Sequence, residues 1–333
     1  MNAQSLEKGM TRRMSYLDAI VQALIEELEA NDNVIVMGED IAVYGGGKLV
    51  ERFDSTRIWS MPISEGSFSG VAIGAAIAGL RPVVDLGIAS FVYLASDQII
   101  NQAAKLKYMT GEQVQVPVVF RATMYYGNSV AAQHSDRPYS LFMNTPGLKI
   151  VCPTTPSDAR GLLKAAIRDD DPVLVFEDTR LWSLKEDVST DPTHIVPIGV
   201  ARVRREGTDV TIVAIAGAIR PALEAAEALA GEGVSVEVID PRTLKPLDAE
   251  TLVKSVNKTG RLIVVENAHR IGGASAEIAA VICENAFESL RCPIIRLTAP
   301  DTHVPFSPIL EAELYPTKAE IIRTAKLLLM RDK

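Results

Sequence analysis

Apolar residues recur along this chain in two alternating patterns, helical spacing and short continuous runs. Ile20, Leu24 and Leu28 share one face of a helix predicted over residues 15–28, and the run at 34–37 predicts a buried strand. The alternation continues to a strand predicted at 172–176. It restarts near residue 210 and ends in a helix predicted over 318–329. Strands that alternate with helices at this spacing predict an α/β fold, with mostly parallel sheets covered by helices on both faces.

A polar stretch that contains a proline, residues 190–193, separates the two alternating halves. The 333 residues also fit two domains, at about 150 residues for each. We therefore expect a flexible leader over 1–13, a first domain over 14–189, a linker over 190–200 and a second domain over 201–333. The leader contains no apolar run of the kind found in a secretory signal.

Composition narrows the classes of function. Hydrophobic residues make up 47% of the chain and charged residues 23%, as in an ordinary soluble globular protein. The net charge of -8 argues against nucleic acid or an anionic membrane as the main partner. Three cysteines without a CxxC pair favour a cytoplasmic location. The uncharged run at 66–80 is shorter than the roughly 20 residues that span a bilayer, so no membrane segment is expected.

The stretch at residues 62–79 holds one carboxylate, Glu65, in an otherwise small and apolar segment. Ser64 is a suitable N-cap for a helix that begins there. Small residues then fall four apart, on one face of that helix: Gly66, Gly70, Gly74 and Ala78. Each helical glycine costs about 0.8–1 kcal/mol relative to alanine, a cost that close approach of another backbone or a flat ligand would offset. The alternative is a tightly packed core helix that starts with a solvated glutamate.

Three further places could carry chemistry. Glu39 follows the strand predicted at 34–37, at the carboxyl end where open α/β sheets place their sites. His134 lies in a long polar and aromatic loop over 121–139, either as a catalytic base or as a surface histidine. The acidic run at 169–171 is either a solvated helix end or a set of ligands for a hard cation. The spacing of histidines and cysteines fits no transition-metal motif.

Several short motifs occur in one order and are jointly specific. They are Gly-Glu-Asp at 38–40, Pro-Ile-Ser-Glu at 62–65, Asp-Gln-Ile-Ile-Asn-Gln-Ala-Ala-Lys at 97–105, Gln-His-Ser at 133–135, Pro-Gly-Leu-Lys at 146–149, Asp-Pro-Arg-Thr-Leu-Lys-Pro-Leu-Asp at 240–248 and Asp-Thr-His-Val-Pro-Phe-Ser at 301–307. From Met14 on, the chain resembles the beta subunit of the thiamine diphosphate-dependent decarboxylase component of 2-oxo acid dehydrogenase complexes. The resemblance implies a pyrimidine-binding domain followed by a transketolase-like C-terminal domain.

The resemblance also implies roles for single residues. Glu65 matches a glutamate that hydrogen-bonds N1′ of the cofactor's aminopyrimidine, where a carboxylate with a raised pKa in an apolar pocket suits proton sharing. Phe91 matches an aromatic residue that packs on the pyrimidine, and Glu39 an acidic residue in a proton path. His134 matches a histidine that faces the thiazolium C2 and assists acylation of a lipoyl group. A monovalent-cation site, expected to hold potassium, maps mostly through backbone carbonyls onto Val118, Ala166, Ile167, Asp169 and Asp171.

The Gly-Asp-Gly motif that binds diphosphate and magnesium in thiamine enzymes does not occur in this sequence. The resemblance therefore implies a shared site, with thiamine diphosphate held partly and Mg²⁺ wholly by an alpha subunit in an α2β2 heterotetramer. The expected activity is that of an oxidoreductase, which decarboxylates a small 2-oxo acid of the pyruvate or branched-chain type. It would pass the acyl group to the lipoyl group of a transacylase core. Alternatives are an acetoin dehydrogenase beta subunit, a two-chain transketolase-like transferase and a non-catalytic scaffold.

Three departures from the family pattern leave the substrate open. The segment at 41–61 is several residues shorter than usual, and the loop that starts Arg-Ala-Thr at 121–123 lacks the more common Arg-Gly-Pro. That loop is somewhat more like the acetoin-cleaving branch. Asp136 also stands where glutamine is common. All three places lie near the expected site.

Overall fold

The computed structural model describes residues 11–42, 46–127 and 129–330, which form two compact units. The first unit comprises residues 1–125 and 144–198, and the second comprises 126–143 and 199–333. The sequence predicts one continuous first domain, whereas segment 126–143 belongs to the second unit. Residues 1–10 of the expected leader lie outside the described residues. Its last three residues open strand β1 (Thr11–Ser15), which pairs antiparallel with β8 (Lys185–Ser189).

A parallel sheet forms the core of the first unit, with its strands in the order β6-β7-β5-β4-β2-β3. The strands are β2 (Val34–Gly38), β3 (Ile58–Ser60), β4 (Arg81–Ile88), β5 (Val119–Met124), β6 (Lys149–Val151) and β7 (Val173–Asp178). Every residue of β2, β5 and β7 is buried, as expected of parallel strands that are covered on both faces. The short strand β3 is the one strand of this sheet that the apolar pattern does not predict.

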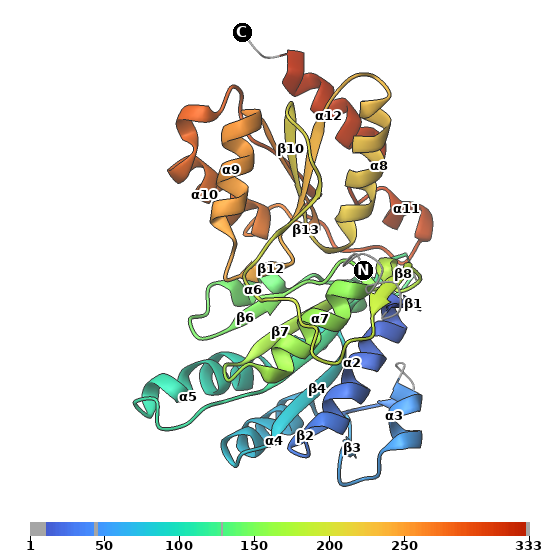
Figure 1. Cartoon of the computed structure of the whole chain (residues 1–333), viewed down its shortest axis with the longest axis vertical. Coiled ribbons are helices and arrows are strands. Elements are labelled where there is room, and N and C mark those ends of the chain that lie inside the picture. Colours follow the sequence, from blue (N-terminus) through green and yellow to red (C-terminus); the bar gives the residue numbers. More distant parts are fainter. Residues whose placement is uncertain (1–10, 43–45, 128, 331–333) are drawn as a thin grey trace, which may run out of the picture. The chain divides into compact units, whose positions relative to one another are not determined.

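Helices α2 (Tyr16–Ala30), α4 (Glu65–Ile77) and α7 (Pro156–Arg168) pack on this sheet, and the unit also contains the short helices α3 (Gly47–Arg52) and α5 (Ala104–Met109). Ser15 caps α2, since its hydroxyl accepts from the amide of Asp18 at 3.1 Å. Figure 1 shows α2 and α7 side by side. A π-helical turn at Gln98–Ala103 precedes α5, so the helical segment that ends at Met109 is not one regular α-helix.

Buried charges join α2, α7 and the stretch expected as a linker. Glu26 on α2 accepts from two fully buried residues of α7, Arg160 at 2.6 Å and Lys164 at 2.5 Å. Arg160 also donates to the carbonyl of Asp191 at 2.7 Å, and Lys164 to that of Pro192 at 2.6 Å. Residues 191–192 are therefore bound to the first unit.

The second unit contains a sheet with its strands in the order β14-β13-β10-β11-β9. Its strands are β9 (Arg202–Arg205), β10 (Val210–Ala214), β11 (Val236–Asp240), β13 (Leu262–His269) and β14 (Ile295–Ala299). All pairings are parallel except that of β9 with β11, which places an antiparallel strand at one edge. The short β12 (Thr243–Lys245) lies between β11 and the next helix in the chain.

Helices also cover both faces of the second sheet. They are α8 (Ile219–Ala230), α9 (Ala249–Thr259), α10 (Ala274–Asn285) and α12 (Lys318–Met330), which packs on α8; the short helix α11 (Pro308–Ala312) precedes α12 in the chain. Figure 1 shows α9 and α10 on one side of the strands, with α8 and α12 on the other. The remaining helix, α6 (Tyr139–Met143), comes from segment 126–143. Both units thus have the predicted α/β architecture.

Candidate active site

Acidic residues gather at the carboxyl ends of neighbouring strands in the first unit. Glu39 directly follows β2, and Asp85 of β4 lies opposite Gly38 in the strand register. The amide of Met61 donates to the carbonyl of Gly38 at 2.9 Å, which brings the segment before α4 to the end of β2. Glu65 is the first residue of α4 and, like Glu39, is 5% exposed. Two predicted site residues are therefore close together and buried.

Burial and neighbouring charges act together on Glu39. Its Oε2 atom is buried and has no hydrogen-bond partner among the described residues. Burial is the largest cause of the raised pKa of Glu39, followed by the negative charges of Glu65, Asp40 and Asp85. Glu39 therefore keeps its proton to a higher pH than an exposed glutamate does. A carboxyl group with a raised pKa beside a second acidic side chain, that of Glu65, is a pair suited to proton transfer.

Asp85, whose charge acts on Glu39, belongs to a buried ion-pair network. Arg121 on β5 donates to Asp85 at 2.6 Å, and it donates to both oxygens of Glu177 on β7, at 2.9 and 3.1 Å. Although burial opposes it, the charges of Asp85 and Glu177 raise the pKa of the Arg121 guanidinium. Burial raises the pKa of Glu177, while Arg121 acts in the opposite direction. The network fixes the strand ends that carry the site.

Asp85, Arg121 and Glu177 belong to this site, although no sequence motif assigns them to it. The one signal available was position, because each of these charged residues occurs within or at the end of an apolar strand run. Gly38 also has a role that its sequence context does not reveal. A Cβ atom added at Gly38 would lie 2.3 Å from the carbonyl oxygen of Asp85, so this strand pair requires glycine there.

The start of α4 differs in one detail from its prediction. Ser64 occupies the N-cap position, but its hydroxyl donates to the carbonyl of Pro62 at 3.0 Å and makes no capping bond. Because Glu65 is buried, the alternative of a solvated glutamate at a helix start is wrong. Its carboxylate makes no hydrogen bond to the residues that the structure describes, which leaves both oxygens available to a ligand.

In the first half of the glycine stripe of α4, neighbouring residues of the same chain pack closely against the glycines. A Cβ at Gly66 would lie 3.0 Å from the carbonyl oxygen of Leu94, and one at Gly70 would lie 3.1 Å from Oε1 of Gln98. At Gly74 a Cβ would meet no atom within 4 Å, and this position is exposed. Close packing within the chain therefore explains Gly66 and Gly70. It does not explain Gly74.

The structure places the two other predicted site residues in different units. Phe91 is half-buried in a 3-10 turn at Ala89–Tyr93, which follows β4 in the first unit. His134 ends a 3-10 turn at Ala132–His134 within segment 126–143, which belongs to the second unit. The structure thus brings Glu39 and Glu65 together, and it assigns His134 to the other unit.

The five residues of the predicted cation site surround the carboxyl end of α7. Each of four carbonyls there already accepts one hydrogen bond. Those of Ile167 and Asp169 accept from Arg81, at 3.0 and 2.9 Å. Those of Val118 and Ala166 accept from backbone amides, at 3.0 and 3.2 Å. Each keeps one lone pair for a cation, at a helix end where cations are favoured.

Basic side chains already neutralise the charges of the carboxylates at the carboxyl end of α7. Lys149 donates to both oxygens of Asp169 at 2.7 Å, and Lys107 donates to Asp171 at 2.7 Å. Among the described residues, no three or more histidine, cysteine, aspartate or glutamate side chains form a group that could hold a metal ion. The carbonyls therefore fit a weakly bound monovalent cation, and the side chains do not form a divalent-metal site.

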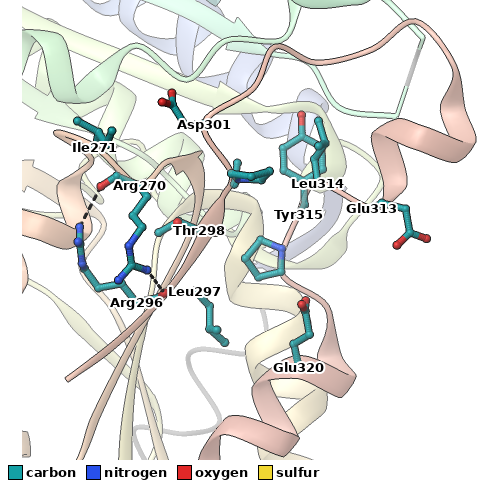
Figure 2. A pocket seen from close by; sticks show the side chains of 13 residues that line it. Arg270, Ile271, Arg296, Leu297, Thr298, Asp301, Glu313, Leu314, Tyr315 and Glu320 are labelled. Carbon is teal, nitrogen blue, oxygen red and sulfur yellow. Dashed lines mark hydrogen bonds between the residues drawn. The ribbon is translucent and has the colours of Figure 1, made fainter. Parts of the chain in front are cut away.

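The second unit contains a pocket of about 470 Å³ (Figure 2). Its walls include Arg270 and Arg296, and each guanidinium donates to the other residue's carbonyl, at 3.0 and 2.9 Å. None of the predicted site residues lines this pocket. The lining of the pocket also includes Tyr315, whose hydroxyl accepts a hydrogen bond from Arg137, a residue of the segment that carries His134, at 3.3 Å.

Comparison with known proteins decides the family. Residues 12–183 match the model of the transketolase pyrimidine-binding domain, and residues 199–321 match that of the transketolase C-terminal domain. The beta subunit of an acetoin:2,6-dichlorophenolindophenol oxidoreductase from Bacillus subtilis is 42% identical, over 94% of this chain and 96% of that relative. The beta subunit of the mitochondrial pyruvate dehydrogenase E1 component from Dictyostelium discoideum is 41% identical, over 97% of this chain and 93% of that relative.

The chain belongs to the beta-subunit family of the 2-oxo acid and acetoin dehydrogenases. The predicted family and fold class are confirmed. A 2-oxoisovalerate dehydrogenase beta subunit from Bacillus subtilis is also 42% identical, over 90% of this beta subunit and 93% of that relative. Among solved structures, a split-gene transketolase, described as an inactive beta4 tetramer, matches with a TM-score of 0.80 and 25% identity. The match covers 96% of this chain and 99% of the transketolase chain.

The family is one of oxidoreductases that use thiamine, so the beta subunit is part of an enzyme and the scaffold alternative is not supported. Within the described parts of the beta subunit, no helix has the length and apolar character needed to cross a membrane.

Proposed function

We propose that this beta subunit joins an alpha subunit in an α2β2 enzyme that cleaves a small 2-oxo acid or hydroxyketone and passes the acyl group to a lipoyl-bearing transacylase core. The observation that carries the proposal is the buried pair of Glu39 and Glu65 at the carboxyl ends of the strands. Relatives named as pyruvate, 2-oxoisovalerate and acetoin enzymes support the reaction class. The experiment is reconstitution with an alpha subunit, followed by an assay of lipoyl-domain acylation with each substrate type. An enzyme that instead transfers ketol groups between sugar phosphates would overturn the proposal.

The first unit fits the pyrimidine part of thiamine diphosphate. When bound, this cofactor supplies the carbon nucleophile and the electron sink that cleavage beside a carbonyl requires. The carboxylate of Glu65 would hold a ring nitrogen by a hydrogen bond, and Phe91 would pack on the ring. Both oxygens of Glu65 are available, and the orphaned Oε2 atom of Glu39 is buried nearby. These features fit a ligand with a nitrogen that gains and loses a proton.

Each acidic residue then has a separate task. Glu65 shares a proton with the ring nitrogen, which is easiest when the two groups have similar proton affinities. Glu39 stores a proton near Glu65, because burial and nearby charges keep its pKa raised. Asp85 adds negative charge to this environment and is held in place by Arg121. His134, on the second unit, donates a proton during transfer of the acyl group to the lipoyl sulfur.

The site is incomplete in this chain. Because the sequence lacks the Gly-Asp-Gly motif, we assign the diphosphate and Mg²⁺ to the alpha subunit. The exposed second half of the glycine stripe, with Gly74 and the half-exposed Val71 and Ile77, supports close packing against that subunit. We assign the carbonyls at the end of α7 to one potassium ion. Its affinity would be low, because Arg81, Lys107 and Lys149 already balance the neighbouring carboxylates.

Acetoin is the second candidate substrate. The sequence Arg-Ala-Thr-Met at 121–124, expected to start a loop, instead ends strand β5, and the ring of the next residue, Tyr125, meets that of Trp182 edge-on with 6.2 Å between the ring centres. Tyr125 belongs to the stretch over 121–139 that distinguishes the two branches in sequence, and Trp182 follows β7. The acetoin and 2-oxoisovalerate relatives are equally identical to this chain, at 42%, so overall identity does not favour either. Parallel assays with pyruvate, 3-methyl-2-oxobutanoate and acetoin separate the candidates, and the preferred substrate is the one with the highest kcat/KM.

A further inference from the structure

Segment 126–143 carries His134 and packs within the second unit, although it follows strand β5 of the first. His134 itself lies in a short 3-10 turn, and its amide donates to the carbonyl of Ala131 at 3.3 Å. This local bond does not fix the turn relative to the rest of the unit. Two buried side chains that follow His134, those of Arg137 and Tyr139, join the segment to the body of the second unit.

Arg137 forms the first anchor. It is 8% exposed, and its guanidinium donates to the carbonyl of Ser135 at 2.5 Å and to the hydroxyl of Tyr315 at 3.3 Å. The guanidinium carbon lies 4.8 Å from the centre of the Tyr315 ring and 5.9 Å from that of Tyr126. The centres of the Tyr126 and Tyr315 rings are 4.5 Å apart. Figure 2 shows Tyr315 beside Leu314. Arg137 thus binds the residue next to His134 to an aromatic pair.

Tyr139 forms the second anchor. Its ring is buried, and its hydroxyl donates to Oε2 of Glu266 at 2.9 Å. Glu266 is fully buried on β13, and its Oε1 accepts from the amide of Ser275 at 2.8 Å. A Cβ added at Gly273 would lie 2.4 Å from that Oε1 atom, so the carboxylate is tightly enclosed. Both oxygens of Glu266 are therefore fixed, and α6 is tied to β13 and α10.

We propose that Arg137 and Tyr139 are positioning residues, through which the second unit sets the location of His134 for acyl transfer. The inference rests on the role proposed above for His134. Neither side chain has to touch a reacting atom, because each acts on His134 through the backbone that follows it, Arg137 by its bond to the carbonyl of Ser135 and Tyr139 by its bond to Glu266. Precise placement matters, since a misplacement of about 1 Å at a catalytic group can cost about 100-fold in rate.

The test uses the α2β2 enzyme with the isosteric substitution Tyr139→Phe. Two activities are measured on each variant, namely cleavage coupled to an artificial dye acceptor and acyl transfer to a lipoyl domain. We expect acyl transfer to fall about 10-fold, while the dye-coupled rate stays within about twofold, because only acyl transfer uses His134. The matched control is Tyr16→Phe. Tyr16 is fully buried in the first unit and donates to the carbonyl of Pro153 at 3.2 Å, so its loss should lower stability and leave the ratio of the two activities unchanged.

Two further variants separate this inference from the proposed function. Arg137→Met keeps the apolar stem and removes the donors, and it should lower the same ratio. In a His134→Ala background, Tyr139→Phe should cause no further loss of acyl transfer. If His134→Ala leaves acyl transfer intact, the proposed role of His134 is wrong. If His134→Ala abolishes acyl transfer while Tyr139→Phe and Arg137→Met keep the wild-type ratio, the positioning role is wrong and the function stands.

Discussion

Glu39 lies beside Glu65 at the carboxyl ends of the first unit's strands, and the charge of Glu65 is, after burial, the largest cause of the raised pKa of Glu39. A carboxyl with a raised pKa binds its proton more tightly in the folded protein than in the unfolded chain. Its contribution to stability is therefore lost as the pH rises from the unfolded pKa through the higher folded pKa. This relationship gives a prediction about stability that is independent of catalysis.

We predict that Glu39→Gln raises the melting temperature at pH 7 by about 2 °C, because the substitution removes a carboxylate that the fold disfavours. The gain should shrink as the pH falls toward 4, where Glu39 is protonated in both folded and unfolded chains. The measurement is thermal unfolding from pH 4 to 8. Glu29→Gln is the control, since Glu29 is exposed and pairs on the surface with Arg52. A Glu39→Gln protein that melts lower than the wild type at pH 7 would contradict the assigned environment of Glu39.

Removal of Arg121 should be far more costly. Arg121→Met leaves Asp85 and Glu177 buried without their counter-charge, and breaking such a pair typically costs about 3–5 kcal/mol. Urea denaturation of the wild type and the variant gives the difference. Arg52→Met is the matched control, because its exposed ion pair with Glu29 should contribute less than about 1 kcal/mol. Equal losses for the two variants would show that the Arg121 network does not hold the strand ends.

These side-chain networks mark the limit of prediction from the sequence. Apolar runs place β2 and β7 within a residue or two, because burial on both faces leaves a local signal. The pair of Arg121 and Glu177 joins residues 56 apart, and no local pattern encodes it. Similarly, segment 126–143 joins the second unit through contacts such as that of Tyr139 with Glu266, which are 127 residues apart. Domain membership of that kind depends on the tertiary fold.

Residue identity predicted more of the site than periodicity did. Glu65 and Glu39 were assigned from short motifs, and the structure brings both to one place and buries them. The apolar pattern does not predict the short strand β3, because a strand of three residues is too short to show a period. It also does not predict the π-helical turn before α5, because the wider turn breaks the 3.6-residue period only locally. The functional roles of Glu39, Glu65, Phe91, His134 and the cation residues stay predictions.

Potassium should stabilise the protein weakly. If the carbonyls at the end of α7 coordinate this ion, replacing choline chloride by potassium chloride at constant ionic strength should raise the melting temperature by about 1–2 °C. Sodium chloride should have a smaller effect because of the ion's size. Identical melting curves in potassium and choline would mean that Arg81, Lys107 and Lys149 supply all the positive charge this place requires.

Cofactor binding should require the alpha subunit. We predict that isothermal titration calorimetry detects little or no binding of thiamine diphosphate and Mg²⁺ to the beta subunit alone, because the sequence lacks the motif that would hold the diphosphate. Addition of the alpha subunit should restore saturable binding. Tight binding to the beta subunit by itself would refute the shared site.

The proposed exchange of a proton between Glu65 and the bound cofactor can be tested with the substitution Glu65→Gln. The amide keeps the shape of the side chain and a hydrogen bond, but it cannot take part in proton sharing. In the reconstituted α2β2 enzyme we predict a fall in turnover of about 10²–10⁴-fold, the range expected for loss of a general acid or base. Sedimentation should show assembly with the alpha subunit unchanged. Turnover close to that of the wild type in the assembled Glu65→Gln enzyme would contradict the account.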